Sequence, residues 1–184
     1  MPLNPTVSRI PLHTRSITIQ GYRREDGLYD IEGRLTDVKT RDIPLATGIR
    51  KAGDNIHEMW LRITVDNKLN IIDAEASSDA VPYAGHCGNI TPAYKQLIGL
   101  SLRPGFSAKV RKIFGGIEGC THITELIGSL ATTAYQTMAG EGHRPENQRP
   151  FQLDGCHALR IDGPAVQEFY PKWYDPKREG AGSA

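Results

Sequence analysis

Residues 119–138 read GCTHITELIGSLATTAYQTM and contain the strongest helical pattern in the chain. Apolar side chains recur along this stretch every three or four residues, which predicts an amphipathic helix over about 121–138. A glycine-rich loop, 115–119, precedes it. The loop therefore delivers Cys120 and His122 to the start of a long helix.

The first half of the chain has a different periodicity, because apolar and polar residues alternate along four segments. Segments 16–24 and 28–39 are separated by a turn at Gly27, and 57–65 and 69–76 form a second pair around a short polar turn. We therefore predict an α+β fold. An antiparallel sheet from the N-terminal half packs against helices from the C-terminal half.

The remaining segments are less regular. Thr91 and Pro92 are typical of a helix start, with Thr91 as the N-cap. Residues 106–114 fit either a short helix or a strand, and 151–161 fit a strand or an ordered loop. We expect an irregular N-terminal arm over 1–14, a single domain over 15–174, and a flexible tail over 175–184.

Bulk composition excludes several classes of protein. The 184 residues carry a formal net charge of +1, without the basic stripe of a nucleic-acid-binding protein. No apolar run reaches the roughly 18 to 20 residues needed to span a bilayer, and the first residues do not resemble a secretory signal. We expect a cytoplasmic protein of a bacterial-type cell that binds neither nucleic acid nor membrane. Assembly into a homo-oligomer is compatible with the sequence.

Every cysteine has a histidine beside it or one residue away. The chain has three cysteines and six histidines, and the clusters are His86-Cys87, Cys120-Thr121-His122 and Cys156-His157. Thiol and imidazole side chains serve soft metal binding as well as nucleophilic and proton-transfer chemistry near neutral pH. The odd number of cysteines argues against a small disulfide scaffold.

Cys120 and His122 are the best placed of these residues. A helix N-terminus presents unpaired N–H groups and the positive end of the helix dipole, and both favour a thiolate. The alternative is that Cys120 is a small apolar residue packed under the loop.

The cysteines also permit a metal site. Cys87, Cys120 and Cys156, completed by His122 or His57, could hold zinc or an iron–sulfur cluster. The absence of a C-x-x-C pair argues against a zinc ribbon or knuckle. Without a nucleotide-binding or zinc-protease motif in the sequence, no cofactor is favoured.

Two further sets of side chains suit acid–base work or ligand binding. His57 and Glu58 begin a predicted strand, and His57 is in phase with its apolar side chains. Arg34, Asp37 and Lys39 recur along strand 28–39, on one face or nearly so. They form either a solvated row of charges or an anion-binding wall in which Asp37 orients the two cations.

Tyr83 follows a proline in an irregular segment. It is a candidate proton donor, and the alternative is a packing anchor.

Several of these stretches together resemble a bacterial family known as domain of unknown function 2889. The resemblance extends from about residue 15 to 173 and is most specific at Gly119-Cys120-Thr121-His122. It is carried in addition by residues 24–28, 37–39, 57–59, Pro82, Tyr83, Cys87 and 153–159. The family brings no assigned activity, and the resemblance implies a role in the chemistry of aromatic or acyl compounds.

We predict a small enzyme that performs acid–base chemistry, of the type that cleaves C–C or C–O bonds, on a small organic molecule. His57 and His122 are the candidate base and acid, Cys120 supports or attacks, and Tyr83 is a possible donor. The substrate-binding candidates are Arg34, Asp37, Lys39 and Glu58. Two alternatives stay open: a metal or iron–sulfur binding protein, and a non-catalytic dimeric interaction module.

Overall fold

The structure, a computed structural model, describes residues 7–141 and 147–176. The chain separates into two compact units, residues 1–141 and 142–184, and each is described by itself. The predicted arm over 1–14 and tail over 175–184 lie partly outside the described residues. The single domain over 15–174 stays a prediction.

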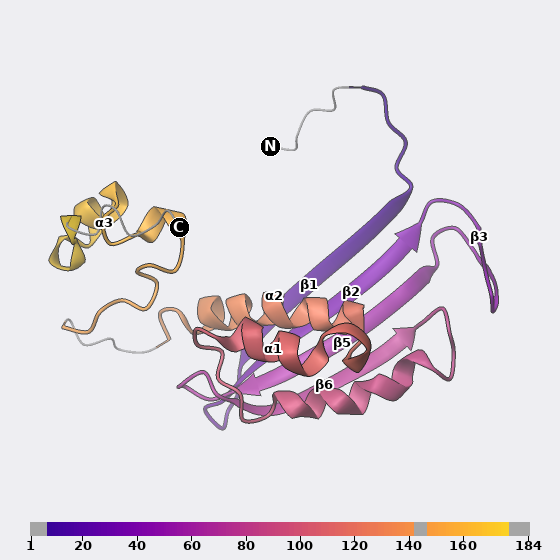
Figure 1. Ribbon diagram of the computed structural model, residues 1–184, viewed down its shortest axis with the longest axis horizontal. Helices are drawn as coiled ribbons and strands as arrows, with labels where there is room; N and C mark the ends of the chain where they lie inside the picture. The colour runs from indigo at the N-terminus through magenta and orange to yellow at the C-terminus, as the bar shows by residue number, and fades with distance from the viewer. Residues whose placement is uncertain (1–6, 142–146, 177–184) are drawn as a thin grey trace. The chain divides into compact units, whose positions relative to one another are not determined.

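The first unit is built on a four-stranded antiparallel sheet in the order β1-β2-β5-β6 (Figure 1). Its strands coincide with the four alternating segments of the sequence to within a few residues at each end. The elements of this unit, in chain order, are β1 (His13–Arg23), β2 (Tyr29–Lys39), β3 (Ile43–Leu45), β4 (Gly48–Arg50), β5 (Asn55–Val65), β6 (Ile71–Ala80), η1 (Cys87–Leu97), α1 (Phe106–Phe114), η2 (Gly116–Glu118) and α2 (Thr121–Met138).

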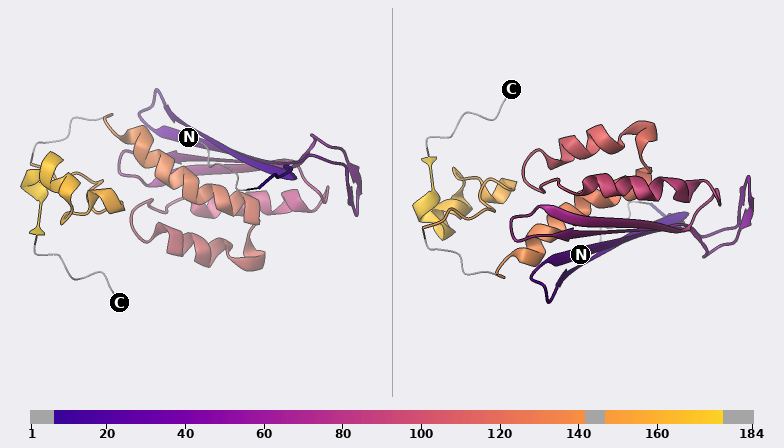
Figure 2. Two further views of the ribbon diagram at one scale, coloured as in Figure 1. Left: turned by 90° about the horizontal axis from the view of Figure 1, so that it is seen from above. Right: turned by 90° about the horizontal axis from the view of Figure 1, so that it is seen from below.

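Helices cover one face of this sheet (Figure 2). Along β2 the residues at odd positions face the helices, and Tyr29, Ile31 and Leu35 are buried there. Helix α2 packs across β1, β2 and β5. It approaches so closely that a Cβ atom at Gly21 would lie 1.9 Å from the Thr137 hydroxyl oxygen. The predicted α+β arrangement is confirmed.

The bounds of α1 and α2 agree with the sequence pattern, whereas those of η1 differ from it. Helix α2 begins and ends as predicted, and 106–114 is helical throughout. The 3₁₀ helix η1, however, begins at Cys87 rather than at Thr91. The Thr91 hydroxyl donates back to the Gly88 carbonyl, so it does not cap a new helix.

One feature of the first unit was not predicted. The short hairpin β3–β4 lies between β2 and β5 and forms a separate two-stranded sheet. Its neighbours fix it in place, since Thr47 and Arg50 donate hydrogen bonds to the carbonyls of Pro82 and Val81.

The second unit consists of short turns of helix. It contains the 3₁₀ turn η3 (His157–Leu159), helix α3 (Pro164–Phe169) and the 3₁₀ turn η4 (Pro171–Trp173), with Leu153 and Val166 buried. Residues 151–161 form turns and this 3₁₀ helix, so the ordered loop, not the strand, describes them. Within the described residues, no helix has both the length and the apolar character required to cross a membrane.

Candidate functional site

Asp37 is the centre of a cluster of charged and aromatic side chains at the end of β2. It continues the inward-facing series of Ile31 and Leu35, so the period of two that builds the core also turns this carboxylate inward. Its side chain is only 3% exposed. A carboxylate this deeply buried requires strong partners.

Arg15 is the principal partner. It lies directly opposite Asp37 on β1, and its Nε and Nη2 atoms donate to the two carboxylate oxygens at 2.9 and 2.8 Å. Burial alone would raise the pKa of Asp37. The hydrogen bonds and charge of Arg15, helped by His57, outweigh burial and lower this pKa to about 2. Asp37 is therefore ionised at neutral pH.

His57 faces Asp37 from the other side. The two residues are paired across β2 and β5, and His57 Nδ1 lies 3.0 Å from Asp37 Oδ2. A β-bulge interrupts the pairing next to them, because Val38 pairs with Asn55 and leaves Ile56 as the extra residue. Bulges of this kind redirect side chains and recur beside active sites.

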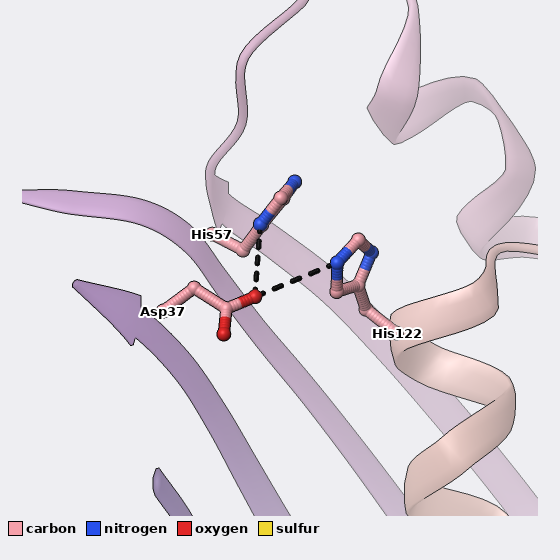
Figure 3. A group of neighbouring side chains, drawn as sticks. All are labelled: Asp37, His57 and His122. Carbon is pink, nitrogen blue, oxygen red and sulfur yellow. Dashed lines mark hydrogen bonds and ion pairs between the residues drawn. The ribbon is translucent and has the colours of Figure 1, made fainter. Parts of the chain in front are cut away.

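The protonation of His57 follows from its surroundings. Burial lowers its pKa, and the bond to Asp37 partly opposes that effect. The neutral ring therefore predominates at neutral pH, with Nδ1–H donating to Asp37. Nε2 is then left as a proton acceptor, and it points away from the carboxylate (Figure 3).

His122 joins the cluster from the first turn of α2. Its Nε2 lies 3.5 Å from Asp37 Oδ2, and its ring lies 3.8 Å from the ring of His57, measured between centroids (Figure 3). Burial lowers the pKa of His122, and the nearby charges of His57 and Arg15 lower it further. Two imidazole rings at this distance disfavour a positive charge on both rings at once.

Tyr94 fixes the loop that delivers His122. The backbone N–H of Cys120 donates to the Tyr94 hydroxyl oxygen at 2.9 Å, and that hydroxyl also bonds the Cys120 carbonyl at 3.0 Å. Gly119 is required here, since a Cβ atom would lie 2.6 Å from the Phe114 carbonyl oxygen. Cys120 Sγ then lies 3.8 Å from His122 Nδ1.

Four contributors to the site were not predicted: His13, Arg15, Tyr94 and Glu125. His13 Nε2 lies 3.0 Å from Asp37 Oδ1, and Glu125 on α2 accepts a bond from Arg15 Nη1. The sequence contained one indication of Arg15. It lies two residues before Ile17, and side chains two residues apart on a strand share a face. The strand was predicted to start at residue 16, which hid that relation.

The remaining predicted residues lie elsewhere. Arg34 was expected on or near the face of Asp37, but this was wrong: it is three positions from Asp37 on a strand and lies on the outer face, bonded to Glu58 at 2.8 Å. Lys39 lies at the end of β2, opposite His13. Tyr83 is 52% exposed in the segment after β6.

A metal could be held by a set of residues other than the predicted one. Within the described part of the chain, Asp37, His57 and His122 offer ligand atoms that all lie within 4.8 Å of one another. Of the predicted ligands, His122 and its alternative His57 belong to this group, and the three cysteines do not. Cys87 begins η1 in the first unit, and Cys156 lies in the second.

Comparison with known proteins agrees with the extent of the first unit. A family described as "Protein of unknown function (DUF2889)" matches residues 13–136, from the first residue of β1 almost to the end of α2. No curated protein and no solved structure matches the chain. The matched segment is more than half of the sequence and includes Arg15, Asp37, His57 and His122. The chain therefore belongs to the DUF2889 family of proteins of unknown function.

Proposed function

We propose that the protein is an enzyme that performs acid–base chemistry on a small organic molecule, with His57 as the general base. The observation that carries this proposal is the 3.0 Å contact between His57 Nδ1 and the buried, ionised Asp37. A carboxylate that binds one imidazole nitrogen fixes the tautomer and orientation of the ring, and it stabilises the imidazolium that forms when the other nitrogen accepts a proton.

His122 is the proposed acid. Its lowered pKa leaves only a minor fraction of His122 protonated at pH 7 and makes that form the stronger proton donor, and the contact with Cys120 Sγ orients its ring. In a C–O cleavage, His57 Nε2 takes a proton from the carbon next to a carbonyl or carboxylate. The electron pair of that C–H bond forms the C=C bond, and the hydroxyl group leaves as water with the proton from His122.

The test is a screen for loss of water from small aromatic and acyl hydroxy acids, beginning with 3-hydroxy-3-phenylpropanoate. Elimination creates a conjugated double bond, which is followed by its ultraviolet absorbance. General base catalysis contributes about 10² to 10⁴-fold, so His57→Gln is expected to lower the rate by at least about 100-fold. The matched control is His86→Gln, an exposed histidine before η1. Equal rates for the two variants would contradict the role of His57.

A second candidate function is divalent metal binding, which the convergence of Asp37, His57 and His122 supports. Zinc binds imidazole nitrogen and carboxylate oxygen at about 2.0 to 2.2 Å, which separates neighbouring tetrahedral ligands by about 3.4 Å. The two histidine nitrogens lie 3.0 and 3.5 Å from Asp37 Oδ2. Both rings have a lowered pKa and are therefore neutral at pH 7, as ligation requires.

This candidate is tested with cobalt(II), whose visible spectrum reports tetrahedral coordination. The metal hypothesis predicts one equivalent bound by the wild type, loss of the spectrum in His122→Gln, and retention in Cys120→Ser. An ion at His57 Nδ1 would displace the proton donated to Asp37 and leave Nε2 protonated. Metal binding and the base function therefore exclude one another, and a wild type that does not bind cobalt leaves only the acid–base proposal.

A further inference from the structure

A small cavity lies between α1 and α2 and is open to solvent, since Arg111, Glu125 and Gly128 in its lining are exposed. Its volume is about 260 Å³, just below the range of roughly 300 to 1,000 Å³ that is usual for ligand pockets. Phe106 and Val110 from α1 and Ile127 from α2 provide apolar walls. A cavity of this size and lining suits a small, mainly apolar molecule.

One wall of the cavity connects it to the cluster. Glu125 lines the cavity and also accepts the hydrogen bond from Arg15, which in turn holds Asp37. Glu125 lies three residues after His122 on α2, so the two side chains share one side of the helix. The cavity is therefore connected to the proposed reaction centre through Glu125 and Arg15.

The charge at the cavity favours an anion. Arg111 lines it, and among the residues that the structure describes this guanidinium has no hydrogen-bonded or charged partner. Residues 103–114 carry four cationic side chains and no acidic one. Glu125 is the carboxylate in the lining, and it accepts a hydrogen bond from Arg15, which it shares with Asp37. Arginine binds carboxylates through two parallel hydrogen bonds.

Gly128 gives a second, independent indication. It lies in the middle of α2, where glycine destabilises a helix relative to alanine. Packing does not require it, because a Cβ atom at this position would meet nothing within 4 Å, and its φ lies in the ordinary range. Gly128 lines the cavity, and the missing side chain keeps that space open.

We infer that this cavity binds a small monocarboxylate with an apolar body, which Arg111 holds by its carboxylate while Phe106, Val110 and Ile127 enclose the rest. The inference deepens the proposed function by naming the substrate class, and it rests on that function only for the reaction that follows binding. Binding itself requires no turnover.

The experiment titrates the protein with benzoate and with its neutral analogue benzamide, and follows the backbone amide NMR signals of Gly115 and Gly128. We expect benzoate to shift both signals and to bind at least about tenfold more tightly than benzamide. Arg111→Gln is expected to weaken benzoate binding about tenfold, the loss of one charged hydrogen-bonding partner. Lys112→Gln, which removes a charge from the same helix outside the cavity lining, is the matched control and should change the affinity less than threefold.

Gly128→Leu adds a side chain to the cavity lining, at a position where a Cβ atom would meet nothing within 4 Å, and is expected to weaken benzoate binding more than tenfold. Gly128→Ala controls for the change in helix stability and should leave benzoate bound. The inference is overturned if benzamide binds as tightly as benzoate, or if Arg111→Gln and Lys112→Gln weaken binding equally.

His57→Gln separates this inference from the proposed function. Because His57 does not line the cavity, the variant should bind benzoate with unchanged affinity. Failure of the wild type to bind benzoate would overturn the cavity inference and leave the acid–base proposal standing. A wild type that binds benzoate but whose turnover of a hydroxy acid is unaffected by His57→Gln would overturn the acid–base proposal alone.

Discussion

The sheet carries two arginine–carboxylate pairs near the same end, one on each face. Asp37 and Arg15 lie on the face covered by helices, whereas Glu58 and Arg34 lie on the opposite face. The strand register places them close together, since Asp37 is opposite His57 and Glu58 is the next residue along β5. The same chemical pair therefore occurs in two environments a residue apart.

The two ion pairs differ in their exposure to solvent and in the side chains that surround them. The Asp37 side chain is 3% exposed, against 19% for Glu58, and Arg34 is 43% exposed. The outer pair is completed by Asn55 and lies beside Trp60, with 5.4 Å from the Arg34 guanidinium carbon to the ring centroid. The inner pair instead gathers histidines. Burial, rather than the ion pair itself, distinguishes a candidate reaction centre from a surface contact.

The largest expected difference is in stability. Asp37→Asn removes the charged partner of Arg15 and of three histidines. Breaking a buried pair by removing one partner costs about 3 to 5 kcal/mol. Because Arg15 is 35% exposed, we expect a smaller loss, about 2 to 3 kcal/mol in the free energy of unfolding.

Glu58→Gln is the matched change on the outer face and should cost less than about 1 kcal/mol, as exposed pairs do. Urea denaturation of both variants measures the comparison. Equal losses would show that burial does not separate the two pairs.

The sequence predicts the two environments only in part. Alternation along 57–65 places His57 on the apolar face, and the period of three and four along 121–138 places His122 at a helix start, so both histidines are found from local patterns. The same alternation, applied strictly to β2, separates Arg34 from Asp37, because an odd spacing of three puts them on opposite faces. The periodicity was sufficient for this distinction.

Other contributors have no local signal. Arg15 reaches Asp37 through the pairing of β1 with β2, and Tyr94 reaches Cys120 across 26 residues of chain. The adjacency of cysteine and histidine in the sequence also proves a poor guide to adjacency in space. Cys120 Sγ lies 3.8 Å from His122 Nδ1, whereas Cys87 begins η1 and Cys156 belongs to the second unit. Such contacts depend on strand register and helix packing, which a single sequence does not specify.

The second prediction concerns pH. The pKa of Asp37 is about 2 in the folded chain and 3.8 ordinarily, so the folded state is stabilised by about 2 kcal/mol above pH 4 and loses this contribution as the pH falls from about 4 to 2. The difference in unfolding free energy between wild type and Asp37→Asn should therefore narrow over that interval. Guanidinium denaturation at a series of pH values measures it.

The histidines add a second pH range in which the stability of the fold changes. His57 and His122 have a lowered pKa in the folded chain, so the unfolded chain binds protons first as the pH falls below about 6.5, and stability declines there. His122→Gln should reduce this decline and leave the interval below pH 4 intact. Glu58→Gln should preserve both. If the stability of the wild type is constant between pH 7 and 5, the pKa values of His57 and His122 are not lowered in the folded chain.

The smallest expected effect is that of salt. The screening length falls from about 10 Å at 0.1 M ionic strength to about 3 Å at 1 M, and screening acts mainly on exposed charges. The cost of Glu58→Gln should therefore shrink by a few tenths of a kcal/mol when sodium chloride is raised from 0.1 to 1 M. The cost of Asp37→Asn should stay constant within error, because protein rather than solvent surrounds that carboxylate. Should the inner pair prove the more sensitive to salt, ions must reach it, and the cluster would then be open to solvent rather than closed around Asp37.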